Sequence, residues 1–224
     1  MHKPTLKERI FRKIESKTNW LFASGRRKRL NNTDFTIISN NCWGGICYEY
    51  FGLKKQSPTI GCYFFAEDYL RFISNLKFYL NKKLEFINLS DSKYSKEINE
   101  YCKLDKENLT APIGLLDDVE IVFLHYQNQQ TAFDKWYRRI ERINYNNLIF
   151  KFSQQNKCNE EHIRQFNNLN LCGKKICFTK AYIPHSSNIY IYGYEKESNL
   201  IDSYNWRENY DLFEFINTGN IIKK

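Results

Sequence analysis

The sequence has 224 residues, of which 42% are hydrophobic, and this is enough for one well-packed core but too short for two full domains. An aromatic content of 17%, with only 9 glycines and 4 prolines, excludes a disordered or low-complexity chain. The seven cysteines form no Cys-x-x-Cys pair, and the N-terminus has no secretory apolar segment. Both features predict reduced thiols in a cytoplasmic protein. The four histidines are scattered singly along the chain, which predicts no metal site.

The positive charge is concentrated near the N-terminus. Residues 1–32 hold ten lysine and arginine side chains against two glutamates, so of the net charge of +9 only +1 belongs to residues 33–224. A nearly neutral body is not typical of a nucleic-acid-binding domain, and we expect no nucleic-acid partner. The basic segment, residues 1–29, suits an anionic membrane surface or another anionic partner.

Residues 1–24 have the pattern of a basic amphipathic helix, with Leu6, Ile10, Ile14 and Leu21 on one side. The helix could anchor the protein peripherally on the inner face of the cell membrane, or it could pack on its own domain. We expect residues 25–32 to be a linker, which gives a basic extension over residues 1–32 and one α/β domain over residues 33–224. No apolar run reaches the ~20 residues that a membrane span needs.

The segment from Phe35 to Phe51 predicts a strand, a polar turn and a helix. Phe35 to Ile38 is short and rich in β-branched residues, as a buried strand would be. Asn40, Asn41, Gly44 and Gly45 then predict a turn whose backbone can adopt positive φ and approach a ligand closely. In an α/β protein this turn lies at the carboxyl end of a strand, where ligands bind.

The next elements are predicted from their apolar patterns. We expect a strand over residues 58–65, a helix over 67–80, a strand over 84–89 and a polar surface excursion over 90–110. Asp68 opens the predicted helix, where a carboxylate either caps the helix or faces the central loop.

A second informative stretch covers residues 111–126. Pro112 and Gly114 predict a turn, and the apolar run Val119 to Leu124 predicts a central strand. His125 follows that strand, and we expect it at the same sheet edge as the Cys42 loop. The next helix, residues 131–143, would place Arg138 and Arg142 on one face, either to hold phosphate or as a solvated surface.

The remaining chain predicts strands over residues 147–152, 175–179 and 188–192 and helices over 160–167 and 210–217. Strands that alternate with helices indicate an α/β sandwich, and we expect a largely parallel or mixed central sheet.

Three functions fit these residues. In the first, Cys42 is a nucleophile at a helix start and His125 its base, with Asp118, Glu120, Asp68 or Glu67 as an orienting carboxylate. At strand rise, Asp118 lies roughly 23 Å from His125 and is too distant for direct contact. In the second, Asn40, Asn41 and the glycine amides hold a sugar donor, and His125 is the base of a glycosyl transfer. In the third, the protein binds glycans or acts as a scaffold without catalysis.

The motif Ile38-Ser-Asn-Asn-Cys-Trp-Gly-Gly45, the run Asp118 to Tyr126 and the segment Lys135 to Asn144 resemble a family of bacterial exopolysaccharide and capsule biosynthesis proteins that is known as a domain of unknown function. The resemblance covers most of residues 33–217. It implies a three-layer α/β domain that works on a cell-surface glycan in the cytoplasm.

We therefore predict a transferase of capsule or exopolysaccharide synthesis, with acyl transfer to a sugar favoured over glycosyl transfer. The donor would be an acyl-CoA or a sugar nucleotide, with no tightly bound cofactor, and the acceptor a glycan or lipid-linked saccharide precursor. The predicted catalytic residues are Cys42 and His125. The predicted substrate-binding residues are Ser39, Asn40, Asn41, Trp43, Gly44, Gly45, Asp68, Trp136, Arg138, Arg139 and Arg142.

Overall fold

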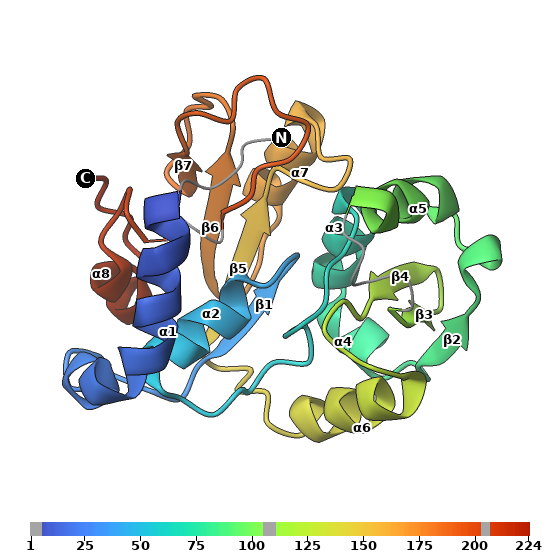
Figure 1. Ribbon diagram of the computed structural model, residues 1–224, viewed down its shortest axis with the longest axis horizontal. Coiled ribbons are helices and arrows are strands. Elements are labelled where there is room, and N and C mark those ends of the chain that lie inside the picture. Colours follow the sequence, from blue (N-terminus) through green and yellow to red (C-terminus); the bar gives the residue numbers. More distant parts are fainter. Residues whose placement is uncertain (1–5, 105–110, 203–206) are drawn as a thin grey trace.

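Two sheets organise the fold (Figure 1). The computed structural model describes the backbone of residues 6–104, 111–202 and 207–224, and its described side chains exclude residues 6–12, 15, 16 and 101–104. A parallel sheet has the strand order β1-β5-β6-β7, and an antiparallel sheet has the order β2-β3-β4. The strands are β1 (Thr36–Ser39), β2 (Glu85–Ile87), β3 (Ile113–Leu116), β4 (Val119–Val122), β5 (Leu148–Ser153), β6 (Lys174–Thr179) and β7 (Asn188–Tyr190).

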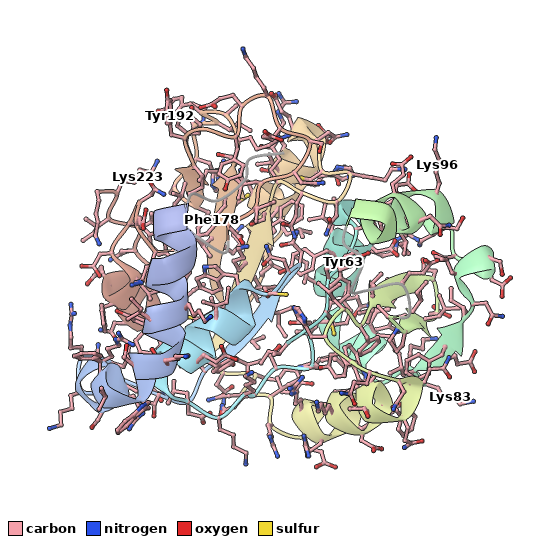
Figure 2. All side chains as sticks on the ribbon, viewed as in Figure 1. Tyr63, Lys83, Lys96, Phe178, Tyr192 and Lys223 are labelled. Atoms are coloured by element: carbon pink, nitrogen blue, oxygen red, sulfur yellow. The ribbon has the colours of Figure 1, made fainter. Side chains whose placement is uncertain are left out.

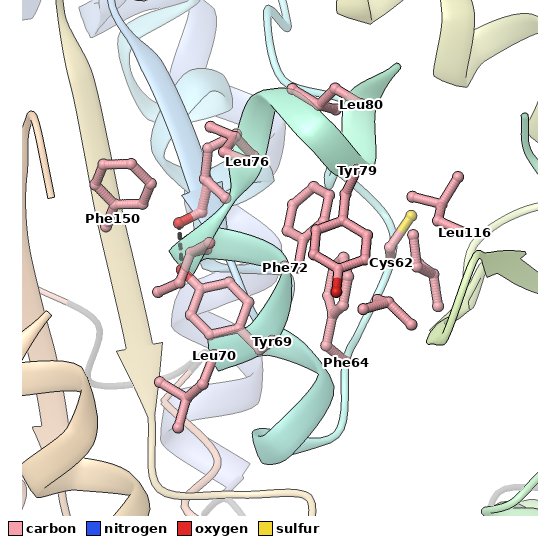
Figure 3. Close-up of a cluster of buried hydrophobic side chains, with 14 of the residues drawn as sticks. Cys62, Phe64, Tyr69, Leu70, Phe72, Leu76, Tyr79, Leu80, Leu116 and Phe150 are labelled. Atoms are coloured by element: carbon pink, nitrogen blue, oxygen red, sulfur yellow. Dashed lines mark hydrogen bonds between the residues drawn. The ribbon is translucent and has the colours of Figure 1, made fainter. Parts of the chain in front are cut away.

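Helices cover both faces of the parallel sheet because its strands alternate their apolar side chains. Ile37 and Ile149 pack toward α2 and α8, whereas Ile38 and Phe150 pack toward α3 and α7. Figure 3 shows the second side, where Tyr69 of α3 and Phe150 of β5 belong to one cluster of buried side chains. The three-layer α/β prediction is confirmed. The helices are α1 (Leu6–Arg27), α2 (Trp43–Phe51), α3 (Ala66–Ser74), α4 (Leu76–Leu80), η1 (Leu89–Asp91), α5 (Ser95–Leu104), α6 (Gln129–Ile140), α7 (Glu160–Asn168) and α8 (Leu212–Thr218).

The antiparallel sheet forms a second lobe with α4, α5 and α6, and α3 lies between this lobe and the parallel sheet (Figure 1). Stacked rings fill the small core: Phe65 and Tyr94 have their ring centroids 3.8 Å apart, against Ile113 and Val122. The lobe is formed by chain that runs between β1 and β5, which are neighbours in the parallel sheet. The second lobe is therefore a long insertion between two neighbouring strands of the parallel sheet.

Several predicted elements differ from the structure. Residues 58–65 do not form the predicted strand. Residues 58–61 are a turn in which Gly61 has φ +78°, and within 62–65 only Tyr63 pairs, in an isolated bridge with Val122. The predicted helix over 67–80 is divided at Asn75, whose backbone is not helical. Gly114 lies within β3 and not in a turn.

The apolar run that we expected as a central strand is β4, at one side of the antiparallel sheet. The polar stretch 90–110 contains part of η1 and all of α5, and residues 105–110 lie outside the described residues. The predictions for the strands near residues 35, 147, 175 and 188, and for the helices near 160 and 210, are confirmed to within a few residues.

Helix α1 is fixed to the carboxyl end of α2. Arg27 donates through Nη1 to the carbonyls of Phe51 and Gly52, at 2.9 and 3.3 Å, and Arg26 donates to the Tyr50 carbonyl at 3.0 Å. The guanidinium groups thereby satisfy carbonyls that the end of a helix leaves without partners. Since α1 continues to Arg27, the predicted linker over residues 25–32 is wrong in its first part.

Within the described residues, no helix is both long enough and apolar enough to pass through a bilayer.

Gly52→Ala tests the contact between α1 and α2. Gly52 has φ +61°, and a Cβ there would lie 2.9 Å from Cβ of Ala23. The left-handed backbone alone costs a non-glycine residue about 1–2 kcal/mol, and the close approach adds to this cost. We expect urea unfolding to show a loss of at least about 1 kcal/mol. Gly25→Ala is the control, because a Cβ at that exposed helical position meets nothing within 4 Å, and it should stabilise the protein by up to about 1 kcal/mol. Equal effects of the two changes would contradict the packing described here.

Candidate active site

Cys42 lies where β1 ends and α2 begins, at the carboxyl edge of the parallel sheet. Its carbonyl accepts the amide of Ile46 at 3.2 Å, and the amide of Trp43 donates to Oδ1 of Asn41 at 3.1 Å. The Cys42 side chain is partly exposed. The strand, polar turn and helix predicted for this segment are confirmed, and the thiol is at the amide-rich start of α2.

Backbone hydrogen bonds of residues 61–64 connect the loop that carries His125 with the loop that carries Cys42. The amide of Phe64 donates to the carbonyl of Asn40 at 3.1 Å, while Tyr63 exchanges two bonds with Val122, of 2.9 and 3.0 Å. The amide of His125 donates to the Gly61 carbonyl at 3.0 Å. This segment joins the two lobes, and Figure 2 labels Tyr63 where they meet.

The side chains of Cys42 and His125 are in contact. Sγ of Cys42 lies 3.2 Å from Nε2 of His125, and which atom carries the proton depends on the tautomer of the ring. The imidazole is exposed to solvent. The expectation that both residues follow parallel strands of one sheet was wrong, because β4 belongs to the antiparallel sheet, yet the two side chains meet.

The loop that carries His125 is held by Gly61, Tyr126 and Arg139. A Cβ at Gly61 would lie 3.0 Å from the Tyr126 ring and 3.5 Å from Cβ of His125. Oη of Tyr126 donates to the Ile60 carbonyl at 2.6 Å, and Nη1 of Arg139 donates to the same carbonyl at 3.0 Å. Arg139 is buried and bonds to protein atoms, so it positions the His125 loop. Gly61 and Tyr126 were not among the predicted site residues.

A buried ion pair lies behind Cys42. Lys151 is 0% exposed and pairs with Asp202, and its Nζ also donates to Oδ1 of Asn41 at 2.9 Å. Nδ2 of Asn41 donates to the Asp202 carboxylate at 3.0 Å. Burial lowers the pKa of the Lys151 ammonium, and the Asp202 carboxylate, with smaller contributions from the Cys177 and Cys42 thiols, opposes that shift. Lys151 is thus within electrostatic range of the candidate nucleophile.

The polar residues of the loop bond to the protein itself. Asn40 pairs with the backbone of Ser153 through both its amide nitrogen and its carbonyl oxygen, each at 3.0 Å. Asn41 completes the Lys151 and Asp202 network, and Oγ of Ser39 donates to the Asn41 carbonyl at 2.6 Å. These side chains, predicted to bind substrate, instead hold the loop in place.

Four further predicted substrate-binding residues belong to the core. Trp43 and Trp136 are 0% exposed, so neither ring can stack on a ligand. Gly44 and Gly45 are helical residues of α2 and do not have positive φ. A Cβ at Gly44 would lie 3.1 Å from Cγ2 of Ile37. The glycine pair therefore lets α2 approach β1 closely, and the positive φ that we expected in this segment is absent.

Asp68, Arg138 and Arg142 were also predicted to bind substrate, and the structure does not arrange them as expected. Asp68 is buried and accepts the amide of Glu120 at 2.7 Å and Nζ of Lys93 at 2.7 Å. Burial raises its pKa, and these hydrogen bonds oppose the rise. Arg138 is exposed, and Arg142 follows the end of α6 at Ile140, so the predicted pair does not share one helix face.

The carboxylates of Asp118, Glu67 and Glu120, which we considered as partners of His125, bond instead to residues of α3 and the second lobe. Asp118 forms an ion pair with Arg71, which also bonds to Glu67 at 2.9 Å. Glu120 accepts the amide of Lys93 at 3.0 Å. We therefore consider Cys42 and His125 as a dyad that does not use any of these carboxylates.

Cys42 differs from the other described cysteines. Burial raises the pKa of the Cys47, Cys62 and Cys177 thiols far above the ordinary value, and it raises the pKa of Cys158 to about 12. A protonated buried thiol is a poor nucleophile. Among the cysteine side chains that the structure describes, Cys42 is the one that contacts a histidine ring. The described residues contain no group of three or more His, Cys, Asp or Glu side chains that could hold a metal ion.

Comparison with known proteins gives a family. The chain belongs to the family described as domain of unknown function DUF1919, whose model matches residues 13–223. It is also 29% identical over 219 residues to an uncharacterized protein of Haemophilus influenzae, covering 94% of this chain and 98% of the relative. Because the match begins at residue 13, residues 13–27 of α1 lie within the family match, whereas the resemblance in the sequence covered most of residues 33–217.

Lys151→Met tests the buried network. The change leaves the Asp202 carboxylate buried without its ammonium partner, which should lower the free energy of unfolding by about 3–5 kcal/mol. The double variant Lys151→Met/Asp202→Asn should lose less than the sum of the two single changes, because it removes both charges. Lys83→Met is the control, since the Lys83 side chain is 80% exposed. Strictly additive single changes in urea unfolding would show that the two residues do not interact.

Proposed function

We propose that this protein is an acyltransferase that carries the acyl group on Cys42 and delivers it to a hydroxyl of a surface-glycan precursor. The observation that carries the proposal is the 3.2 Å contact between Sγ of Cys42 and Nε2 of His125 at the start of α2. A helix N-terminus and a neighbouring imidazole both favour the thiolate form of cysteine. Partial exposure of Cys42 gives a donor access to the sulfur.

The first half-reaction transfers the acyl group from a thioester donor such as acyl-CoA. The Cys42 thiolate attacks the carbonyl carbon, and a bond from Sγ to that carbon forms. The carbon–sulfur bond to the donor then breaks, and the leaving thiolate takes the proton of the His125 imidazolium. The products are acyl-Cys42, neutral His125 and the free thiol of the donor.

The second half-reaction uses the neutral imidazole as a base. Nε2 of His125 takes the proton of a sugar hydroxyl while the oxygen attacks the acyl-Cys42 carbonyl. Collapse of the tetrahedral intermediate breaks the bond to Sγ and restores the thiolate and imidazolium. No oxidant, reductant or further reactant is needed.

The start of α2 supports the charge that develops on the carbonyl oxygen. The first amides of a helix have no intrahelical acceptor, and the side chain of Asn41 binds the amide of Trp43. The next amides, of Gly44 and Gly45, belong to the same turn and are the donors that we propose for the oxyanion. A glycan precursor as acceptor is supported by the resemblance of the Ile38–Gly45 motif to exopolysaccharide and capsule proteins.

Glycosyl transfer with a sugar nucleotide is less well supported by the geometry. That mechanism required the Asn40 and Asn41 side chains as ligands for the donor, and both bond to Ser153, Lys151 and Asp202. It remains an outcome of the cellular experiment below.

Acylation of the purified protein tests the first half-reaction. With acetyl-CoA and no acceptor, intact-mass and peptide mass spectrometry should show one acetyl group on Cys42. His125→Gln should slow its formation by about 10²–10⁴-fold, the contribution typical of a general acid or base, and Cys42→Ala should abolish it. Cys172→Ala is the matched control, because Cys172 is exposed and precedes the amino end of β6, whereas Cys42 follows the carboxyl end of the parallel strand β1. Acetylation that persists in Cys42→Ala at the wild-type rate would exclude this mechanism.

The surface polysaccharide tests the acceptor. We expect a strain that lacks the gene to lose an acyl substituent from an otherwise intact repeat unit, as seen by proton NMR and mass spectrometry. Neither Cys42→Ala nor His125→Ala should restore it. A missing sugar that is restored by Cys42→Ala but not by His125→Ala would instead mean glycosyl transfer with a structural cysteine, and full restoration by both variants would mean a non-catalytic role.

A further inference from the structure

The exposed part of α1 presents large apolar side chains to solvent. Ile14, Trp20, Leu21 and Phe22 are between 55% and 73% exposed, and we call these four residues the outer face of α1. Single exposed apolar residues are common on protein surfaces, but a cluster on one short helical segment marks an interaction site. The proposed acyl transfer makes no use of these residues.

The outer face cannot turn toward the core, because other residues of α1 hold the helix against the rest of the protein. Ala23 is buried, and Arg26 and Arg27 donate to carbonyls at the end of α2. Arg29, just beyond the helix, lies over the ring of Phe213, 3.5 Å from its centroid. Ile14 and Leu21 are seven residues apart, which places them on one side of a helix. The apolar exposure is therefore a lasting property of the folded protein.

The charges around the outer face identify its partner. Lys13, Lys17 and Lys28 are exposed, and residues 1–32 hold nearly all of the net positive charge. Exposed apolar and aromatic side chains together with lysines on one helical segment are typical of helices that lie in the plane of an anionic bilayer. A second copy of the chain would bring the same positive charges together, which disfavours self-association through this face.

We propose that the outer face of α1 binds the surface of a bilayer that contains anionic lipid. Trp20, Leu21 and Phe22 enter the boundary between headgroups and acyl chains, and the lysines contact the headgroup phosphates. The proposal is independent of the acyltransferase proposal, since it does not involve Cys42 or His125.

Vesicle sedimentation with the full chain tests this surface. We expect binding to vesicles of phosphatidylcholine with phosphatidylglycerol and much weaker binding to phosphatidylcholine alone, with a loss of affinity as salt screens the charges. Leu21→Ser/Phe22→Ser should weaken binding at least about tenfold, because each apolar side chain contributes more than 1 kcal/mol when fully buried. Lys17→Gln and Lys28→Gln should each weaken it about fivefold, as expected from about 1 kcal/mol per lysine near an anionic surface.

Matched controls lie elsewhere on the surface. Tyr192 is 80% exposed on another part of the molecule, and the Lys83 side chain is also 80% exposed, so Tyr192→Ser and Lys83→Gln should leave vesicle binding unchanged. Equal affinity for neutral and anionic vesicles, or equal losses in the controls, would overturn the proposal. So would a dimer that Leu21→Ser/Phe22→Ser dissociates in the absence of vesicle binding, because the face would then be a protein interface.

Discussion

The backbone hydrogen bonds of residues 61–64 hold the two halves of the candidate site together. The amide of Phe64 bonds to Asn40, two residues before Cys42, and Tyr63 bonds to Val122, three residues before His125. Each bond contributes only about 1 kcal/mol net, but together they fix the two loops relative to each other. Because they join main-chain atoms, the contact between thiol and imidazole depends on how the lobes are connected. The lobes cannot shift at this point without breaking these bonds.

The ion pair of Lys151 and Asp202 fixes the Asn41 side chain in one orientation. An ammonium can only donate and a carboxylate can only accept, so Oδ1 of Asn41 must face Lys151 and Nδ2 must face Asp202. With Oδ1 in that position, the amide of Trp43 has its acceptor, and the start of α2 is set. Burying two charges costs desolvation free energy, and an apolar pair would often be at least as stable. The contribution of the ion pair is therefore to fix the orientation of the Asn41 side chain next to Cys42.

The sequence allowed the contact of Cys42 with His125 to be anticipated, although for a wrong reason. An apolar run such as Val119–Val122 predicts a strand but does not say which sheet it joins. Likewise, Gly44 and Gly45 fit a ligand-binding turn and a close helix contact equally well, and only the position of Ile37 decides between them. The sequence could have indicated a buried role for Lys151, since a lysine between Phe150 and Phe152 is unusual in a buried strand. No feature of the sequence indicates that Asp202, far along the chain, is the partner of Lys151.

The described basic residues near the N-terminus fall into two groups, bonded and exposed, that their sequence positions do not separate. A guanidinium presents several donors in a rigid fork, which suits the carbonyls at the end of α2, whereas an ammonium on a flexible stem suits a mobile headgroup. Arg26 and Arg27 accordingly bind the protein, while Lys13, Lys17 and Lys28 are exposed at the surface. Helix α2 has α1 at its carboxyl end and Cys42 at its start, and its nine residues span about 13 Å at 1.5 Å per residue. If both proposals hold, the nucleophile is kept at a fixed, short distance from the bilayer, where an acceptor on a lipid carrier can reach it.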